Sequence, residues 1–213
     1  MFYKTYAKRP LGFLLALAAG VIAFPFALPI AVWIKLDSKG PVLFKQKRLG
    51  LHGREFTMYK FCSMQVGAET QGSGVYCYKG DLRVTRVGRI LRKTSLDEIP
   101  QLINILKGDM GFVGMRPPLT YHPCRIDEYT EEQKKVFNLR PGITGWAQIN
   151  GRNAVEWDER IRLNLWYQEH VTFLLDVKII LHTVLDVLQK RDVLVEKDTL
   201  GSFNAKTRAT EEK

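Results

Sequence analysis

The chain opens with a long apolar segment, from Leu11 to Ile34, in which no residue carries a charge. As one straight helix this segment would reach about 36 Å, which exceeds the roughly 30 Å of a bilayer's hydrocarbon core. Pro25 and Pro29 lie inside it, one helical turn apart, and Pro25 cannot donate a hydrogen bond to the carbonyl of Val21. We therefore expect a bend, with pieces of about 21 Å and about 13 Å that are each too short to cross a bilayer.

Both flanks of the apolar segment are basic. Lys4, Lys8 and Arg9 precede it, and Lys35, Lys39, Lys45, Lys47 and Arg48 follow it. Because positive charge favours the cytoplasmic side of a membrane, both ends are drawn to the same face. We predict that residues 1–36 form a re-entrant membrane helix, bent at Pro25 and Pro29, that enters one leaflet and returns. A cleaved signal peptide, a single spanning helix and a buried core helix are the alternative interpretations.

Shorter patterns follow, typical of a globular domain over residues 37–190. Residues 41–61 predict two short strands around a Gly-Leu-His-Gly turn, a β-hairpin, and the Gly-, Ser- and Thr-rich residues 66–81 predict a loop. Helical periodicity is found over residues 83–91, 97–107, 155–169 and 173–189, and Thr130 with Gln133 has the spacing of a capping box. Residues 191–213 form a polar tail. The fold is therefore predicted to be α+β and mostly helical, with a small β-hairpin.

Composition narrows the choice of partners without deciding it. The length of 213 residues suits one domain with an appendage. The formal net charge of +10 indicates an anionic partner: nucleic acid, a phosphorylated small molecule or anionic lipid. Cys62, Cys77 and Cys124 are odd in number and scattered, which argues against a disulfide framework and for a reducing compartment.

Two adjacent acids, Asp97 and Glu98, stand out in this basic chain. Five cations come shortly before them: Arg83, Arg86, Arg89, Arg92 and Lys93. Pro100 predicts that a helix begins at Asp97 or just before it, because proline is tolerated in the first helical turn. Acids at that end of a helix are commonly simple caps, stabilised by roughly 0.3–1 kcal/mol.

The neighbouring arginines favour a second interpretation of the acids. Consecutive helical residues point about 100° apart, so the two carboxylates cannot act in the same way on one atom. One could attack phosphorus as a nucleophile while the other binds Mg²⁺ or moves a proton, with arginines contacting phosphate oxygens. The arginines could instead form a solvated face, a lipid-headgroup face or a nucleic-acid surface. The absence of interleaved aromatic residues argues against nucleic acid.

Four stretches of the sequence together resemble one known family. They are QKRLG at 46–50, YKFCSM at 59–64, RVGRILRKTSLDEIPQLINILKGDMGFVGMRP at 86–117 and RPGITGWAQINGRN at 140–153. In this order and spacing they resemble the small monotopic phosphoglycosyl transferases of the bacterial sugar transferase family. The resemblance extends from the apolar segment to about residue 189. The chain departs from the family pattern at Phe24, Cys62 and Met115, where the family commonly has serine, a basic residue and proline.

The resemblance implies an α+β catalytic domain that moves a phospho-sugar from a UDP-sugar to a polyprenol phosphate such as undecaprenyl phosphate. The products would be UMP and a polyprenyl-diphosphate-linked sugar, in the first membrane step of glycan assembly. It implies that Asp97 is the nucleophile and forms a covalent aspartyl-phosphosugar intermediate. Glu98 would bind the metal or assist the nucleophile, and Mg²⁺ would be the cofactor, with Asp97 and Glu98 as its ligands. The substrate-binding residues implied are Lys60, Arg92, Arg116, Arg140 and Arg152.

The resemblance also implies a location at the bacterial inner (cytoplasmic) membrane, with the catalytic domain on the cytoplasmic face. The phospholipid bilayer would then be a partner and nucleic acid would not. The main alternative is a non-catalytic, membrane-anchored basic protein that binds anionic lipid or nucleic acid. In that case neutralising the arginines, and not Asp97, should weaken binding in a salt-dependent way.

Overall fold

The structure is a computed structural model that describes residues 2–71, 74, 77–78, 80–150 and 156–189. Its main elements are α1 (Lys8–Asp37), β1 (Leu43–Leu49), β2 (Glu55–Phe61), α2 (Arg86–Lys93), α3 (Gln101–Lys107), β3 (Gly111–Val113), α4 (Glu131–Lys134), β4 (Gly142–Thr144), α5 (Trp146–Ile149), α6 (Trp157–Glu169) and α7 (Phe173–Leu188). A π-helical turn at Tyr3–Ala7 precedes α1, and 3₁₀ turns lie at Leu51–Gly53, Ala68–Thr70, Leu96–Glu98, Ile126–Glu128 and Lys135–Asn138. The predicted mostly helical α+β fold is confirmed, and the tail predicted for 191–213 lies outside the described residues.

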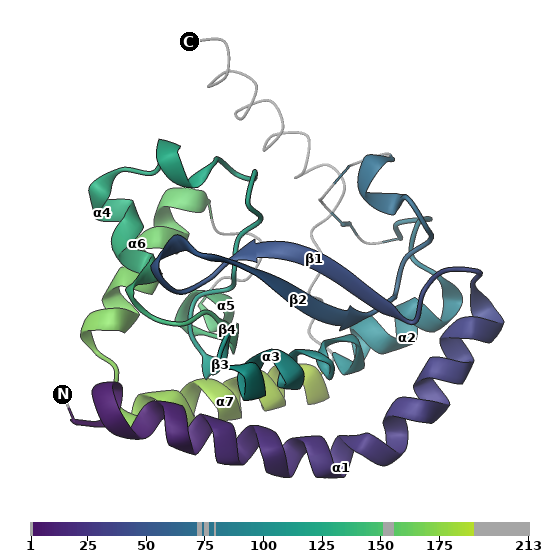
Figure 1. Cartoon of the computed structure of the whole chain (residues 1–213), viewed down its shortest axis with the longest axis horizontal. Coiled ribbons are helices and arrows are strands. Elements are labelled where there is room, and N and C mark those ends of the chain that lie inside the picture. Colours follow the sequence, from purple (N-terminus) through teal and green to yellow (C-terminus); the bar gives the residue numbers. More distant parts are fainter. Residues whose placement is uncertain (1, 72–73, 75–76, 79, 151–155, 190–213) are drawn as a thin grey trace.

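Helix α1 contains the whole apolar segment, and the stretch Tyr3–Asp37 is long and apolar enough to cross a membrane by length and composition. Pro25 and Pro29 both lie inside it. Figure 1 shows α1 running along the base of the molecule and then turning upward along its right-hand side. A helix interrupted by proline is expected to change direction in this way.

One side of α1 forms part of the hydrophobic core. In its first half Ala16 is buried in a cluster with Phe56, Met58, Ile105 and Met110. In its second half Ile30 and Ile34 are buried with Phe61 of β2, the following Cys62, and Val87 and Leu91 of α2. Both halves of the apolar helix therefore pack against the domain.

Both ends of α1 are also joined to the domain by polar contacts. At the start, Lys8 forms an ion pair with Asp176 of α7, and its Nζ donates to the hydroxyl of Tyr167 at 2.6 Å. At the other end, the carboxylate of Asp37 accepts a hydrogen bond from the backbone N–H of Val87, the second residue of α2, at 2.8 Å. The two ends of the apolar segment thus contact the same body.

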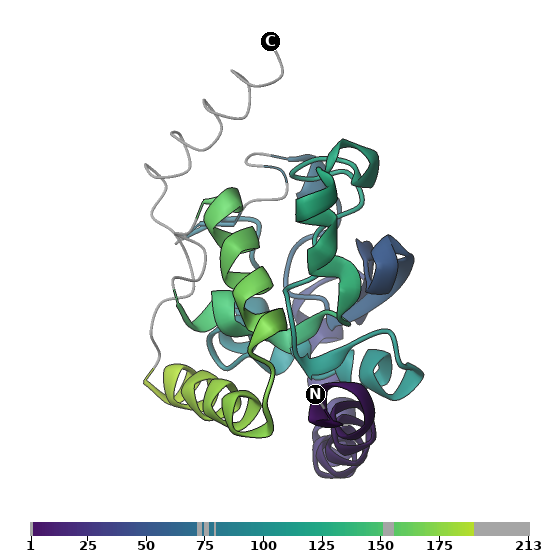
Figure 2. The ribbon, with the colours of Figure 1, turned by 90° about the vertical axis from the view of Figure 1, so that its left-hand side faces the viewer.

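The outer sides of α1 and α7 expose many large apolar side chains. On α1 they include Phe13, Leu14, Ile22, Phe24, Phe26, Leu28 and Trp33, and on α7 they are Phe173, Leu174, Leu181, Val184, Leu185 and Leu188. Figure 2 shows α1 and α7 at the same lower edge of the molecule, as does Figure 1. Exposed apolar side chains gathered along one edge are typical of a surface that contacts a membrane or another protein.

The predicted hairpin is confirmed. Strands β1 and β2 pair antiparallel from Leu43↔Phe61 to Leu49↔Glu55. At the turn, His52 and Gly53 have positive φ angles of 57° and 70°, which explains a glycine-containing connection. The alternation along β2 places Lys60 on the same side as the buried Phe56 and Met58, and thereby directs a cation inward.

A second, parallel strand pair was not predicted from the sequence. Strands β3 and β4 are three residues each and pair Gly111↔Gly142 and Val113↔Thr144. A side chain at Gly142 would lie 2.2 Å from the backbone nitrogen of Gly114, so glycine is required for this close approach. Such short strands leave no readable alternation in the sequence.

Helices α4, α6 and α7 agree with the sequence patterns within the described residues, and α2 differs at its start. The capping box of Thr130 and Gln133 opens α4, and α7 follows its predicted range. Helix α6 begins at Trp157, and the predicted start near residue 155 lies outside the described residues. The prediction that α2 includes Arg83 is wrong: α2 begins at Arg86, because Thr85 caps it and Arg83 lies buried in an ion pair with Asp81.

Candidate active site

The two acids lie in the 3₁₀ turn Leu96–Glu98 and not in an α-helix. The prediction that the helix begins at the first acid is wrong, because α3 begins at Gln101. Pro100 has no N–H to donate to the carbonyl of Leu96, which instead accepts from the N–H of Ile99 at 3.3 Å. Neither the turn nor α3 has a side-chain cap, so the interpretation of the acids as simple caps is not supported.

Ser95, just before this turn, adopts a left-handed conformation with a φ angle of 56°. Residues other than glycine rarely adopt it, and here it redirects the chain between the end of α2 and the acids. As a result Arg92, in the last turn of α2, comes close enough to Asp97 for its charge to act on that carboxyl group.

Glu98 is bound by two cations from separate parts of the chain. Its Oε1 lies 2.8 Å from Nζ of Lys60 on β2 and 3.3 Å from a terminal guanidinium nitrogen of Arg116. Burial alone would raise the pKa of Glu98, but the charges and hydrogen bonds of these two cations outweigh it and lower the pKa to about 2. Glu98 is therefore ionised over the whole physiological range.

Asp97 is 8% exposed, and its environment raises its pKa, whereas that of Glu98 is lowered. Burial raises its pKa, the charge of Glu98 raises it further, and the cations Lys60, Arg92 and Arg116 only partly offset these effects. The net pKa of Asp97 lies above that of an ordinary aspartate. Two neighbouring carboxylates thus differ in proton affinity, an arrangement found at catalytic sites.

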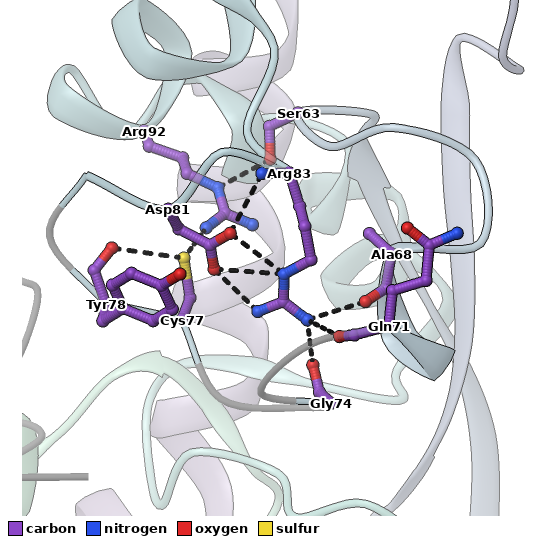
Figure 3. A network of polar contacts seen from close by, with 9 residues as sticks. All are labelled: Ser63, Ala68, Gln71, Gly74, Cys77, Tyr78, Asp81, Arg83 and Arg92. Atoms are coloured by element: carbon purple, nitrogen blue, oxygen red, sulfur yellow. Dashed lines mark hydrogen bonds and ion pairs between the residues drawn. The ribbon is translucent and has the colours of Figure 1, made fainter. Parts of the chain in front are cut away.

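Arg92 is held by two uncharged groups. Its Nε donates to the hydroxyl oxygen of Ser63 at 2.8 Å, and its Nη1 donates to the sulfur of Cys77 at 2.8 Å. Both contacts are visible in Figure 3. Within the described part of the chain Arg92 forms no ion pair, so its positive charge is oriented without being neutralised by a carboxylate.

The structure brings Lys60, Arg92 and Arg116 together around the acid pair but does not bring Arg140 there. Nε of Arg140 donates to the carbonyl of Gly108, beyond the far end of α3, at 2.8 Å. Its pKa is lowered by burial and by the charge of Arg9, a residue of α1. Arg152 lies outside the described residues. Substrate-binding roles for these residues remain predictions.

Sequence reasoning missed two groups near the site, Arg48 and Ser63. Arg48 lies within QKRLG and donates to the carbonyl of Pro117 at 3.0 Å. Burial and the nearby charge of Arg116 lower the pKa of Arg48 to about 10. The available signal was the position of both residues inside stretches shared with the family, Arg48 in QKRLG and Ser63 in YKFCSM.

Asp97 and Glu98 offer two adjacent carboxylates as possible ligands of Mg²⁺. Among the described residues there is no group of three or more His, Cys, Asp or Glu side chains that could enclose a metal ion. Mg²⁺, however, is commonly bound by one or two carboxylates together with substrate phosphates and water. Both ion pairs of Glu98 use Oε1. Two adjacent carboxylates of this kind fit a Mg²⁺ ion shared with a phosphate, and they do not fit a metal held by protein alone.

Similarity to known proteins identifies the family of the chain. A model of the family described as "Bacterial sugar transferase" matches residues 3–190. The chain belongs to the bacterial sugar transferase family. The family predicted from the four sequence stretches is confirmed, and with it the prediction of an enzyme of the phosphoglycosyl transferase class.

Three relatives of this sugar transferase are similar over most of its length. A Bacillus subtilis protein named "Uncharacterized sugar transferase EpsL" is 45% identical over 177 residues, which cover 83% of this chain and 82% of the relative. A Xanthomonas campestris "UDP-glucose:undecaprenyl-phosphate glucose-1-phosphate transferase" is 39% identical over 194 residues, 89% of this chain and 40% of the relative. An Aeromonas hydrophila "UDP-N-acetylgalactosamine-undecaprenyl-phosphate N-acetylgalactosaminephosphotransferase" is 39% identical over 186 residues, 86% of this chain and 44% of the relative. The chain spans less than half the length of the last two relatives.

Proposed function

We propose that this sugar transferase moves a phospho-sugar from a UDP-sugar to undecaprenyl phosphate and releases UMP, as the first membrane step in building a glycan. The observation that carries the proposal is the buried Asp97, which lies beside an acid held ionised by Lys60 and Arg116 and within reach of the charge of Arg92. The two relatives named for undecaprenyl phosphate are named for different sugars, so they support the class of reaction and leave the sugar open.

In the first step of the proposed mechanism, a carboxylate oxygen of Asp97 attacks the phosphorus that bears the sugar. An oxygen–phosphorus bond to Asp97 forms while the bond from that phosphorus to the bridging oxygen breaks, and UMP leaves with the bridging oxygen. In the second step an oxygen of undecaprenyl phosphate attacks the same phosphorus, and Asp97 leaves as a free carboxylate. A covalent intermediate replaces one difficult transfer by two easier displacements.

The electrostatics of the pair suit this division of roles. The raised pKa of Asp97 means a more basic carboxylate, which is a better nucleophile once ionised. With a pKa of about 2, Glu98 is a poor proton donor and a poor base near neutral pH. We therefore assign Glu98 the role of a fixed negative charge and metal ligand. Lys60, Arg92 and Arg116 would contact the phosphate oxygens of the donor.

Asp97 and Glu98 would also be the protein ligands of Mg²⁺. Bound there, the cation would supply positive charge against the donor diphosphate and the departing UMP. The contribution of the chain itself is to hold the two carboxylates next to each other on one short turn, with the ammonium of Lys60 2.8 Å from the second.

We further propose that α1 is re-entrant and that the catalytic domain lies on the cytoplasmic face of the inner membrane. The contacts of Lys8 and Asp37 support this, because both ends of the apolar helix touch one body. The exposed apolar side chains of α7 lie along the same edge, so this edge would face the lipid. An active site there would meet the phosphate of a lipid at the level of the headgroups.

A non-catalytic, membrane-anchored basic protein is the second candidate. In its favour, Arg86, Arg89 and Lys93 on α2 are exposed and could contact anionic headgroups. It offers no reason for the buried Asp97 or for the two cations that bind Glu98.

The test is UMP release from a panel of UDP-sugars with Mg²⁺ and undecaprenyl phosphate, using the full chain in nanodiscs. Asp97→Asn is compared with Asp158→Asn, the same change at an exposed site on α6. UMP release that needs one particular donor, is lost in Asp97→Asn and survives in Asp158→Asn establishes the proposal. Release that is equal in both variants contradicts it. If folded wild-type protein releases no UMP from any donor, the non-catalytic candidate takes first place.

A further inference from the structure

Arg83 is buried at the centre of a polar cluster that the proposed chemistry does not use (Figure 3). Among the described residues its Nη1 donates to the backbone carbonyls of Ala68, Gln71 and Gly74, each at 2.7 Å. Its Nε and Nη2 donate to the carboxylate of Asp81 at 3.0 and 2.6 Å. One guanidinium thus ties together backbone positions that lie up to 15 residues before it in the chain.

The cluster reaches Arg92 through Cys77. The thiol of Cys77 donates to the backbone carbonyl of Tyr78 at 4.0 Å, and the charge of the nearby Asp81 carboxylate acts on it. Burial raises the pKa of the Cys77 thiol, which therefore keeps its proton at neutral pH. The sulfur of Cys77 in turn accepts from Arg92. Arg83 thus holds the chain on both sides of Cys77, at Gly74 and at Asp81, and Cys77 contacts Arg92.

Arg92 differs from the other cations around the acids in the groups that hold it. Lys60 and Arg116 bind the carboxylate of Glu98. Arg92 is instead oriented by a hydroxyl and a thiol, neither of which cancels its charge. A guanidinium fixed in direction by neutral groups is prepared to bind a phosphate through two parallel hydrogen bonds, which demand a defined orientation.

We propose that Arg83 is a positioning residue for donor binding: by holding Gly74 and Asp81, on either side of Cys77, it places the sulfur that fixes the guanidinium of Arg92 toward the diphosphate of the UDP-sugar. This inference rests on the proposed function. Only arginine suits the position, because its planar fork presents donors on several sides at once. A lysine, with three donors on one nitrogen, cannot serve three carbonyls and a carboxylate together.

The test is a double-mutant cycle on the full chain in nanodiscs, with Arg83→Lys, Arg92→Gln and the combination. We expect Arg92→Gln to raise the KM for the UDP-sugar about 10-fold or more, with a smaller change in kcat. Arg83→Lys should raise the KM by a similar factor in the wild-type background, and by less than about 2-fold when Arg92 is already glutamine. Cys77→Ala should behave like Arg83→Lys. Cys77→Ser should recover most of that loss, because a hydroxyl can also accept a hydrogen bond from Arg92.

A purely structural role for Arg83 is separated by a matched control. Ile179→Ala removes a buried side chain of α7 and lowers thermal stability without touching the cluster. If Arg83→Lys lowers kcat/KM by the same factor whether or not Arg92 is present, or no more than Ile179→Ala at equal loss of stability, the inference is overturned.

Failure of the proposed function is recognised separately, as the absence of UMP release by wild-type protein. In that event the same four proteins of the cycle are compared in the dissociation constant for inorganic pyrophosphate with Mg²⁺, which requires no turnover. Loss of affinity in Arg83→Lys that disappears in the Arg92→Gln background still supports the positioning role. Independent losses, or none, contradict it.

Discussion

Nζ of Lys60, on a strand of the hairpin, lies 2.8 Å from Oε1 of Glu98, on the short turn before α3. The contact joins two elements that are 38 residues apart in the chain. It lowers the pKa of Glu98 and, more weakly than burial raises it, that of Asp97. The hairpin therefore tunes the acid pair as well as packing against it.

A covalent intermediate on Asp97 is the first prediction. Wild-type protein given its UDP-sugar and Mg²⁺ without lipid phosphate should release about one equivalent of UMP and gain the mass of a phospho-sugar. Asp97→Asn should show neither and lose about 10³-fold or more in turnover. Intact-protein mass spectrometry and peptide mapping make the measurement. A phospho-sugar on any other residue would falsify the assignment of the nucleophile.

The second prediction concerns the acid side of the pH–rate profile. Lys60 lowers the pKa of both carboxyl groups, so Lys60→Met should raise both. Asp97 must be ionised to attack, and kcat/KM should therefore begin to fall at a higher pH than in the wild type as the solution is acidified. Lys134→Met, which removes a cation paired with the exposed Glu131, should leave the profile in place. An unshifted profile in Lys60→Met would contradict the electrostatic account.

The ion pair at the start of α1 gives a third prediction. Lys8→Met leaves the buried carboxylate of Asp176 without its cation, although Tyr3 and Tyr167 still donate to it. We expect a loss of about 3 kcal/mol in the free energy of unfolding. Thermal and denaturant unfolding in one detergent would measure it. Lys134→Met removes an exposed pair and should cost less than about 1 kcal/mol, and a similar cost for both variants would show that the buried pair has no special weight.

The topology of α1 is the fourth prediction. A single cysteine at position 2, in a chain whose Cys62, Cys77 and Cys124 are replaced by serine, should react with a membrane-impermeant thiol reagent only after cells are opened. A cysteine at Leu51, on the hairpin turn, should behave in the same way. Labelling of position 2 from outside intact cells, with position 51 protected, would indicate a spanning helix and exclude the re-entrant one.

Local patterns in the sequence predicted the elements whose causes are local. The hairpin follows from alternation and a turn that contains Gly53, and α4 follows from the reciprocal cap of Thr130 and Gln133. The apolar run with Pro25 and Pro29 likewise predicted a long helix that changes direction. In each case the residues that decide the structure lie within a few positions of one another.

The contacts that the sequence did not predict are those that distant parts of the chain decide. Arg83 has the spacing of a helical face but is drawn out of it by Asp81 and three carbonyls. Arg140 belongs to a stretch shared with the family, yet its guanidinium contacts the carbonyl of Gly108 rather than the acids. The pairing of Lys60 with Glu98 depends on how the hairpin packs beside the turn, which no local pattern in the sequence records.

Because Ala16, Ile30 and Ile34 are buried in the domain, the proposed membrane anchor is also part of the hydrophobic core. The common way to make a membrane enzyme water-soluble is to cut off its anchor. Here a cut after Asp37 would expose Ile105, Val87 and their neighbours to solvent, and the remaining domain would be unstable and prone to aggregation. Experiments on this sugar transferase should therefore keep α1 and use lipid or detergent to cover the outer side of the helix.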